Sequence, residues 1–249
     1  MRFYFAGAEG SYKECLEGER KLMSYYYLNK KKKIDFNFEK EQILLDSGGF
    51  QALTMGIDIE VKDYANFINK HKIKLAFELD VGGKKKTLYN RDYLLKNTRA
   101  TIIPIYHIKE YEEKDYKYLF DMVDNFEYIS IGGIAGSRKN DKKIIPFLDY
   151  VFKQVKNRRK IHGLGVVGVK PMLRYPFYSV DFTSWMNPAI YGQHFKFKNG
   201  ILKRIGHTTP NINKFMDSKE QIKLAIKEIK LWEKYLTKLW KKRGITWDS

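Results

Sequence analysis

Short apolar segments that alternate with charged, helix-like segments are the feature that most restricts how this chain can fold. Seven apolar runs rich in β-branched and aromatic residues occupy 2–8, 42–48, 74–80, 101–107, 128–134, 160–167 and 177–184. Charged segments with helical spacing lie between most of them, at 61–71, 89–97, 110–123 and 142–155. Strands that alternate with helices predict a parallel sheet. Seven strands in roughly 180 residues favour an α/β fold of the (β/α)8 TIM-like barrel type, irregular because no eighth strand is evident. A doubly wound open sheet is the alternative.

The pattern changes after residue 184. Residues 194–205 alternate around Asn199-Gly200, a type I′ hairpin signal. Residues 218–243 predict a long amphipathic helix, because large apolar side chains recur on one face and lysines occupy the others. The stripe consists of Ile222, Ile226, Ile229, Trp232, Leu236 and Leu239. We expect the hairpin and helix to complete one domain that spans residues 1–249.

The charge of the chain suggests a polyanionic partner. The formal net charge is +18, from 47 Lys and Arg against 29 Asp and Glu. Such a charge favours nucleic acid, with a merely solvated lysine-rich surface as the alternative. Cys15 is the only cysteine, which excludes an intramolecular disulfide and a multi-cysteine zinc site and suits a reducing cytoplasm. No signal peptide or run of 18 apolar residues is present, so we expect a cytoplasmic protein without a membrane segment.

Three acids occupy equivalent places in this pattern. Asp46, Asp80 and Asp181 each stand at the end of an apolar run. In a parallel barrel the carboxyl ends of all strands open on one face, so these carboxylates are expected to meet at one mouth. A single aspartate after a strand is more often a turn former or a helix cap.

Glycine pairs accompany these strand ends, at 48–49, 82–83 and 132–133. Glycine lets the backbone approach a ligand closely and leaves its N–H groups unshielded. Three pairs at strand ends suggest a slot for a planar ligand, although each pair by itself is equally typical of a tight turn.

Five motifs together resemble the tRNA-guanine transglycosylase superfamily. They are DSGGFQ at 46–51, FELDVGG at 77–83, ISIGGIAG at 129–136, IHGLGVV at 161–167 and YSVDFTSW at 178–185. The hexapeptide is the most specific, and the resemblance covers roughly residues 40–190. The short chain and the YPFYSVDFTSW form of the last motif are most similar to the phage and bacterial DNA-guanine transglycosylases. Those enzymes exchange guanine in DNA for a 7-deazaguanine.

The resemblance implies base exchange at C1′ of a nucleotide. An aspartate attacks the sugar, guanine leaves, and a 7-deazaguanine (queuine is one such base) displaces the enzyme from a covalent glycosyl intermediate. The implied partners are DNA, or tRNA, together with free guanine and 7-deazaguanine, and no metal or cofactor is expected.

Roles follow for residues of the first two motifs. Asp46 matches the acid that contacts the base and acts as general acid/base, and Ser47, Gly48 and Gly49 shape the pocket beside it. Asp80 matches the acid that accepts hydrogen bonds from N1 and N2 of the purine.

The remaining base-binding candidates lie in or near the later motifs. The backbone of Gly132, Gly133 and Ile134 is expected at the O6 edge of the base. His107 ends the fourth apolar run and is a candidate to line the pocket. Phe50 is a candidate to stack on the base or close the pocket, although an aromatic residue is more commonly part of the core.

Asp181 is the expected nucleophile, and two departures from the tRNA enzymes qualify the resemblance. Those enzymes carry two aspartates on this strand and use the second, where this chain has Ser184. Asp46 and Ser184 are the alternative nucleophiles. The three-cysteine, one-histidine zinc site of the tRNA enzymes is also missing, which favours DNA over tRNA.

Basic residues would hold the polymer while a nucleotide is flipped out or presented as single strand. The candidates are Lys84, Lys85 and Lys86, just after Asp80, and Lys203 with Arg204 in the hairpin. His162 is a candidate either for substrate contact or for a hydrogen bond inside the barrel.

Other functions remain open. The same chemistry on tRNA by a minimal transglycosylase is one. A metal nuclease that uses Asp46, Glu78 and Asp80 is a second. A third is a nucleic-acid-binding subunit that has lost catalysis, as Ser184 suggests.

Overall fold

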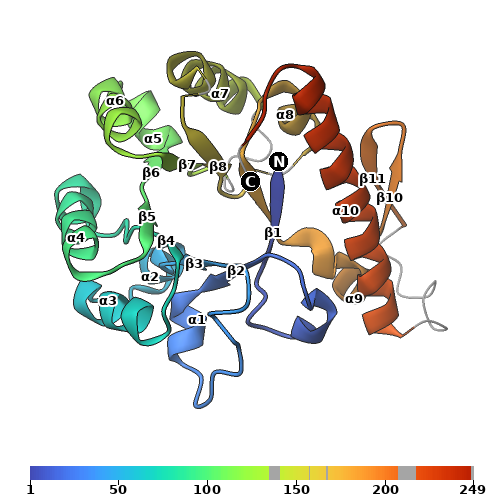
Figure 1. Cartoon of the computed structure of the whole chain (residues 1–249), viewed down its shortest axis with the longest axis horizontal. Coiled ribbons are helices and arrows are strands. Elements are labelled where there is room, and N and C mark those ends of the chain that lie inside the picture. Colours follow the sequence, from blue (N-terminus) through green and yellow to red (C-terminus); the bar gives the residue numbers. More distant parts are fainter. Residues whose placement is uncertain (135–140, 157, 167, 207–216, 248–249) are drawn as a thin grey trace.

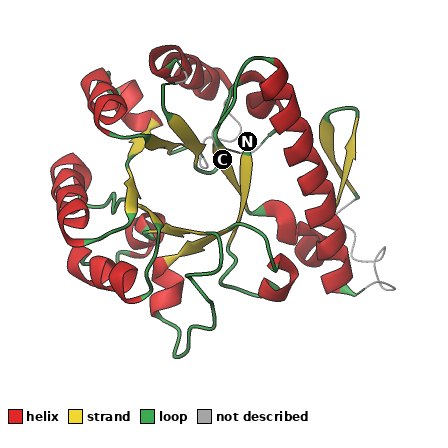
Figure 2. Cartoon of the chain, in the orientation of Figure 1, coloured by secondary structure: helices red, strands yellow, loops and turns green. Residues whose placement is uncertain are grey.

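A ring of parallel strands with helices outside it dominates the computed structural model, which describes residues 1–134, 141–156, 158–166, 168–206 and 217–247 (Figures 1 and 2). The strands lie in the order β5-β4-β3-β2-β1-β9-β8-β7-β6, and every pairing between them is parallel. The strands are β1 (Arg2–Ala6), β2 (Lys21–Ser24), β3 (Ile43–Asp46), β4 (Leu75–Phe77), β5 (Thr101–Ile103), β6 (Ile105–His107), β7 (Tyr128–Gly132), β8 (Lys160–Gly163) and β9 (Ser179–Phe182).

The ring closes through Pro104, which joins β5 and β6 at the two ends of the strand order. Proline has no N–H to donate to a sheet, so the predicted strand at 101–107 is broken there into two short strands. The Ser130 N–H donates to the Pro104 carbonyl at 2.8 Å, and the Ile105 N–H donates to the Glu78 carboxylate at 2.6 Å. Counted as one bent strand, β5 and β6 leave eight strand positions, which confirms the predicted barrel. The open-sheet alternative is wrong.

The eighth position, which was not evident in the sequence, is β2. Its four residues are too few and too polar at their ends to stand out, since Lys21 and Ser24 flank only two apolar residues. β2 nevertheless pairs with β1 on one side and with β3 on the other, because its backbone completes the ladder between them.

The helices follow the strands as βαβ geometry requires. They are α1 (Tyr25–Asn29), α2 (Gly49–Met55), α3 (Val61–Lys70), α4 (Gly83–Asn97), α5 (Ile108–Glu112), α6 (Tyr116–Asn125), α7 (Asp141–Val155), α8 (Val169–Arg174), α9 (Asn187–Tyr191) and α10 (Ser218–Lys242), with short 3₁₀ turns η1 (Lys13–Leu16) and η3 (Ser184–Met186). The predicted helix at 110–123 is divided into α5 and α6, where Lys114 adopts a positive φ of 60°.

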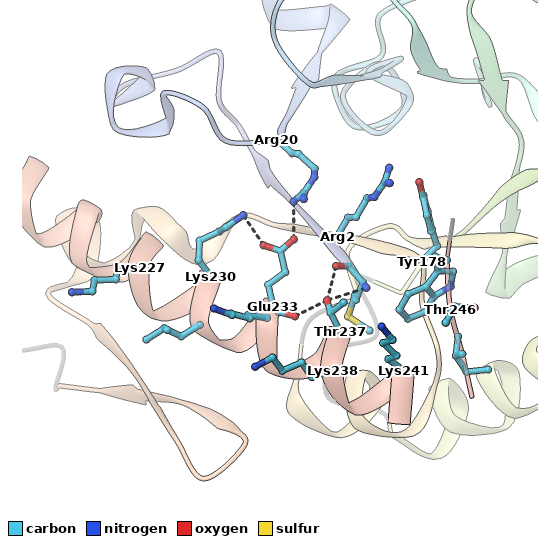
Figure 3. A pocket seen from close by; sticks show the side chains of 15 residues that line it. Arg2, Arg20, Tyr178, Lys227, Lys230, Glu233, Thr237, Lys238, Lys241 and Thr246 are labelled. Carbon is cyan, nitrogen blue, oxygen red and sulfur yellow. Dashed lines mark hydrogen bonds and ion pairs between the residues drawn. The ribbon is translucent and has the colours of Figure 1, made fainter. Parts of the chain in front are cut away.

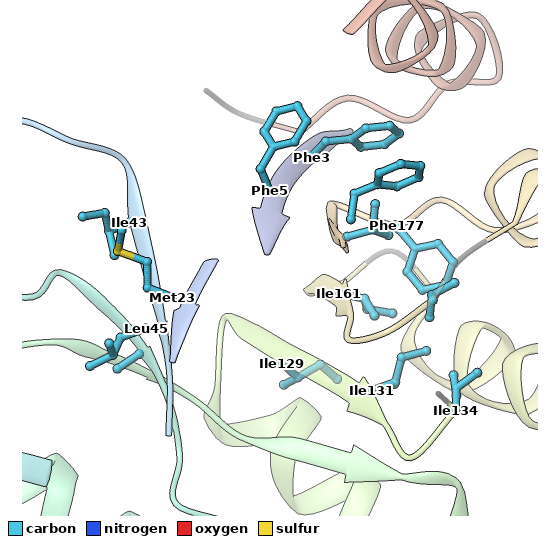
Figure 4. Packing of buried hydrophobic residues seen from close by; sticks show 14 of the residues in the cluster. Phe3, Phe5, Met23, Ile43, Leu45, Ile129, Ile131, Ile134, Ile161 and Phe177 are labelled. Carbon is cyan, nitrogen blue, oxygen red and sulfur yellow. The ribbon is translucent and has the colours of Figure 1, made fainter. Parts of the chain in front are cut away.

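Side-chain alternation along the strands separates two apolar clusters. Phe3 and Phe5 of β1 belong to the larger cluster between strands and helices, as do Ile129 and Ile131 of β7 (Figure 4). Residues one position away on the strands, among them Tyr4, Leu44 and Tyr128, belong to a second cluster inside the ring. The barrel interior is thus filled by side chains, and inward positions nearer the carboxyl ends of the strands are left for polar groups.

The C-terminal elements form as predicted. β10 (His194–Lys198) and β11 (Ile201–Ile205) pair antiparallel, and the turn residues Asn199 and Gly200 both have positive φ, as a type I′ turn requires. The hairpin packs on the outer side of α10 (Figure 1). Along α10 the predicted apolar stripe faces the barrel, with Leu239 at its partly buried edge. Within the described ranges, no helix has the length and apolar character needed to cross a bilayer.

Candidate functional site

Carboxyl groups from three strands converge at the carboxyl end of the barrel. Asp46 is the last residue of β3, Asp181 is the third residue of β9, and Asp80 lies three residues beyond β4. Asp46 and Asp181 share the inward side of their strands with Leu44 and Ser179 respectively, two residues earlier. The charges of Asp80 and Asp181 both act on Asp46, so the three acids lie in one electrostatic cluster.

Asp46 lies in surroundings that favour the protonated form of its carboxyl group. Burial raises its pKa to about 7, and the negative charge of Asp80 and, less strongly, those of Asp181 and Glu9 add to the effect. The Gly48 N–H donates to Asp46 Oδ2 at 3.0 Å and acts in the opposite direction. A carboxyl group with a pKa near 7 exchanges protons readily in both directions at physiological pH.

The glycines after Asp46 bring the next turn against Asp80. Gly48 has a φ of 82°, which glycine adopts readily, and Gly49 then begins α2. A Cβ at Gly49 would lie 2.5 Å from Asp80 Oδ1, so only glycine permits this approach. Ser47 is buried, and its Oγ accepts the Gly49 N–H at 3.3 Å. The first glycine pair therefore serves both a tight turn and a close contact with the second acid.

Asp80 pairs with His107, which ends β6. His107 Nε2 lies 2.9 Å from Asp80 Oδ2, and both side chains keep some exposure to solvent. Burial alone would lower the pKa of His107, but the hydrogen bond and charge of Asp80 outweigh it and raise the pKa. Asp80 Oδ1 has no hydrogen-bond partner among the described residues, so one oxygen of this carboxylate is free to accept from a ligand.

The second glycine pair lies beside the same histidine. Gly132 ends β7 opposite His107 in the ladder, and a Cβ there would lie 3.2 Å from His107 Nδ1. Gly133 has a φ of 74°, and Ile134 is buried in the outer core. The backbone of this turn therefore runs next to the Asp80–His107 pair, while the Ile134 side chain points away into the protein.

Asp181 is fixed from two directions. Its Oδ1 accepts the Gly165 N–H at 2.5 Å, and His162 Nε2 lies 3.6 Å from the same oxygen. The Asp181 side chain is only 8% exposed. Its Oδ2 has no protein hydrogen bond within the ranges the structure describes, which leaves that oxygen available to a ligand.

A chain of hydrogen bonds under Asp181 holds His162 inside the barrel. Tyr128 Oη lies 2.5 Å from Ser179 Oγ, which lies 2.6 Å from His162 Nδ1. His162 is completely buried, and its Nε2 has no hydrogen-bond partner in the described part of the chain. The hydrogen bond with Ser179 thus holds the His162 ring next to Asp181. The Nε2 atom of His162, which has no hydrogen-bond partner in the described part of the chain, faces the Asp181 carboxylate.

Glu9 is a fourth acid of this cluster that the sequence reasoning missed. It follows β1, is 5% exposed, and burial raises its pKa. Its Oε2 has no partner among the described atoms, and neither does the buried Oγ of Ser24 at the end of β2. The signal was present in the sequence, because Glu9 stands between Gly7 and Gly10 just after an apolar run, as the other acids do near their glycines.

Ser184 and Trp185 lie beyond the cluster. Ser184 begins η3 after β9, and in the described part of the chain no histidine or carboxylate hydrogen-bonds its hydroxyl. Trp185 is fully buried and donates its Nε1–H to the Ala6 carbonyl at 2.8 Å, so it is a core residue. A serine without a neighbouring base is a poor nucleophile, and Asp181 remains the better candidate.

Phe50 is on the surface. It is 72% exposed in the first turn of α2, directly after the Asp46 motif, and is therefore available for stacking. Leu53 and Met55 of the same helix are also mostly exposed. Phe50 and Leu53 are three residues apart, so these two exposed apolar side chains lie on the same face of α2.

The basic candidates divide into two groups. Lys84, Lys85 and Lys86 lie in the first turn of α4, four to six residues after Asp80, and all are exposed. Lys84 pairs with Asp115, and Lys86 lies 4.0 Å from Asp58. Lys203 and Arg204 are on β11, separated from the strands by α10, so the structure does not bring them together with the acids (Figure 1).

Glu78 is not part of the acid cluster. Its carboxylate is fully buried, receives Arg91 Nε at 2.6 Å and Arg91 Nη2 at 3.1 Å, and also accepts the Ile105 N–H. It is therefore committed to the closure of the barrel, and the nuclease hypothesis loses one of its three ligands. Among the residues that the structure describes, no three His, Cys, Asp or Glu side chains are grouped to hold a metal ion.

Comparison with known proteins provides one relative. No model of a known protein family matches the chain. The chain is 27% identical over 207 residues to an uncharacterized protein, protein 306, of Sulfolobus islandicus rod-shaped virus 1. The match covers 78% of this chain and 62% of the viral protein, so the chain spans less than two thirds of the length of that relative. The chain is therefore similar to a viral protein, and its activity has to be argued from its own residues.

Proposed function

We propose that this chain exchanges guanine in DNA for a 7-deazaguanine base through a glycosyl ester on Asp181. The observation that carries the proposal is the arrangement of acids with different surroundings at the carboxyl end of the barrel. Asp181 accepts a backbone N–H and keeps one free oxygen, whereas Asp46 has a pKa of about 7. Two carboxyl groups in unlike environments are what a two-step exchange at C1′ needs, one as nucleophile and one as proton carrier.

In the first step Asp181 Oδ2 attacks C1′ of the deoxyguanosine. The C1′–N9 bond breaks, its electron pair goes to the departing guanine, and the Asp46 carboxyl group gives that guanine its proton. The products are an ester between Asp181 and C1′, free guanine and an Asp46 carboxylate. The raised pKa of Asp46 supports this role, because with a pKa of about 7 a substantial fraction of the group is protonated near neutral pH.

In the second step the Asp46 carboxylate takes the proton from N9 of the incoming 7-deazaguanine. N9 then attacks C1′ and the Asp181–C1′ bond breaks, which returns both acids to their starting states. No oxidant, reductant or other co-reactant is consumed. His162 contributes by position, since it supports Asp181 from below at 3.6 Å.

Recognition of the base is assigned to the Asp80–His107 side of the cluster. Asp80 Oδ1 is free and accepts from N1–H or N2–H of the guanine edge, while Oδ2 stays with His107. The turn at Gly132-Gly133 presents backbone next to His107, without a Cβ in the way, and is suited to the O6 edge. Both guanine and 7-deazaguanine carry these groups, so one pocket accepts the leaving and the entering base.

The exposed side chains of α2 are suited to a flipped nucleotide. A base in a duplex must leave the stack to expose C1′, which costs a few kcal/mol. Phe50 and Leu53 are three residues apart on α2 and share one exposed face beside the acids. We propose that these two side chains fill the gap that the extruded base leaves in the duplex. Exposed lysines such as Lys85 would then contact the neighbouring phosphates.

A trapping experiment tests the proposal. The protein is mixed with labelled single-stranded or duplex DNA and a 7-deazaguanine, denatured, and examined for a DNA adduct that survives denaturation. We expect an adduct in the native protein and none in Asp181→Asn, because an amide oxygen cannot form the ester. Asp121→Asn, which changes an exposed carboxyl group on α6, is the matched control and should form the adduct normally.

Other outcomes would replace the proposal. An adduct with tRNA but not DNA would assign the same chemistry to tRNA. An unchanged adduct in Asp181→Asn would refute Asp181 as the nucleophile. Binding of DNA without any adduct or any exchange of labelled guanine would leave a non-catalytic nucleic-acid-binding subunit. The viral relative is consistent with a virus-encoded enzyme that acts on DNA in the cytoplasm of a host.

A further inference from the structure

A strongly basic pocket lies at the opposite end of the barrel from the acids. It has a volume of about 830 Å³ and lies between α10 and the amino-terminal ends of the strands (Figure 3). Arg2 begins β1, Arg20 directly precedes β2, and Tyr178 directly precedes β9. Because all strands of the barrel run in the same direction, these residues mark the end away from Asp46 and Asp181.

Positive charge dominates the wall of this pocket. Five of the lining residues are lysines on α10, and Arg2 and Arg20 add two more cations. The lysines are Lys227, Lys230, Lys234, Lys238 and Lys241. Glu233 is the acid among the lining residues. Cations gathered this closely repel one another unless an anion lies between them.

Glu233 does not neutralise this group, because its carboxylate is already engaged. Its Oε1 accepts from Arg20 at 2.7 Å and from the Phe3 N–H at 3.1 Å, and its Oε2 pairs with Lys230 at 2.7 Å. The Arg2 guanidinium lies 4.7 Å from the centre of the Tyr178 ring, and among the described residues no carboxylate is within ion-pair distance of it. In the described part of the chain, no carboxylate lies within ion-pair distance of Lys227, Lys234, Lys238 or Lys241.

The spacing of the lysines indicates an extended ligand. They recur at intervals of three or four residues, which places them along one face of α10. Fourteen positions separate Lys227 from Lys241, a length of about 21 Å at 1.5 Å per residue. A strand of duplex DNA places a phosphate about every 3.4 Å along the axis, so this length matches about six phosphates. A mononucleotide or inorganic phosphate would reach only a small part of the row.

We propose that the face of α10 formed by these lysines, with Arg2, is a binding site for the phosphodiester backbone of a nucleic acid. Contacts of lysine with phosphate carry no sequence information, so the site holds the polymer irrespective of sequence. It goes beyond the proposed base exchange and does not depend on it, since none of its residues touches the acid cluster.

The test compares two triple variants that lose the same charge. Lys234→Gln, Lys238→Gln and Lys241→Gln together remove three exposed lysines of the row, while Lys230 is kept because it pairs with Glu233. Lys62→Gln, Lys96→Gln and Lys117→Gln remove three exposed lysines from α3, α4 and α6 as a matched control. Binding of fluorescent 20-nucleotide single-stranded DNA is measured by anisotropy over a range of KCl concentrations, with circular dichroism to verify folding.

We expect the α10 variant to bind at least tenfold more weakly than the native protein at low salt. The slope of log Kd against log salt should fall by about 2, because about 0.7 counterions are released for each phosphate contact of a single strand. The control should lose little affinity. Equal losses in both variants would mean that only net charge matters and would overturn the proposal.

Two further measurements separate this site from its alternatives and from the exchange reaction. Inorganic phosphate and a mononucleotide serve as competitors for the bound DNA. If either one displaces the DNA completely at a concentration near the Kd of that competitor, the pocket is a small-anion site and the proposal is overturned. Adduct formation at saturating DNA should be unchanged in the α10 variant, and Asp181→Asn should keep its DNA affinity. If the α10 proposal fails, DNA affinity is the quantity that departs from expectation. If the Asp181 chemistry fails, it is adduct formation, so the two failures can be distinguished.

Discussion

Replacement of Asp46 by asparagine should stabilise the folded chain at neutral pH and leave it unchanged in acid. The folded pKa of Asp46 is about 7 against an ordinary value of 3.8, with burial as the main cause. The folded state therefore holds this proton more tightly than the unfolded state. Its contribution to stability is complete below about pH 4, and it is lost as the pH rises through 7 and the buried carboxylate ionises.

The magnitude follows from the shift. A difference of about 3.2 pKa units corresponds to about 4 kcal/mol at 1.36 kcal/mol per unit. Asp46 keeps some solvent contact, so we expect about 2–4 kcal/mol at pH 8 and close to zero at pH 3. Asparagine carries no charge and retains an oxygen for the Gly48 N–H, so the variant lacks the ionisation cost while its turn is preserved.

Urea unfolding from pH 3 to pH 9, followed by circular dichroism, measures the effect. The free energy of unfolding of Asp46→Asn minus that of the native chain should increase through this range and level off above about pH 7. Asp121→Asn, on the surface of α6, should show no such dependence. A difference that does not vary with pH, or a variant that is less stable at pH 8, would refute the assignment of a raised pKa to Asp46.

Other substitutions test the remaining contacts. Gly49→Ala should reduce guanine exchange by at least tenfold, because the added Cβ would lie 2.5 Å from Asp80 Oδ1; Gly56→Ala, which has no neighbour within 4 Å but a positive φ of 63°, controls for backbone strain in α2 without a clash at the acids. Glu78→Gln should destabilise the fold by about 3–5 kcal/mol in urea unfolding, since it leaves Arg91 buried without a charged partner, whereas Glu127→Gln, at an exposed pair with Arg159, should cost less than about 1 kcal/mol. Phe50→Ala should raise the KM for duplex DNA more than that for single-stranded DNA while thermal stability stays unchanged, because Phe50 is exposed; equal KM values for the two substrates would argue against a role in base extrusion.

The amino-acid sequence by itself determined the architecture, because periodicity is a local property. Alternation of apolar runs with amphipathic segments was sufficient to predict a barrel and the order of most of its strands. Asn199-Gly200 specified the hairpin, since both residues tolerate positive φ, and the apolar stripe of 218–243 specified the last helix. The prediction that Asp46, Asp80 and Asp181 meet at one mouth also followed, because parallel strands end on the same face.

Only the tertiary structure decided which acids belong to the cluster at the carboxyl end of the barrel and which are paired within the barrel wall. Glu78 and Asp80 are two positions apart in one motif, yet Glu78 is paired with Arg91 in the barrel wall and Asp80 faces His107. Glu9 joined the cluster only because its buried carboxyl group lies close enough for its charge to act on Asp46. The pKa of Asp46 and the exposure of Phe50 likewise depend on how far water is excluded at each point. Burial and the distance between charges arise from contacts between remote segments, and no local pattern in the sequence encodes them.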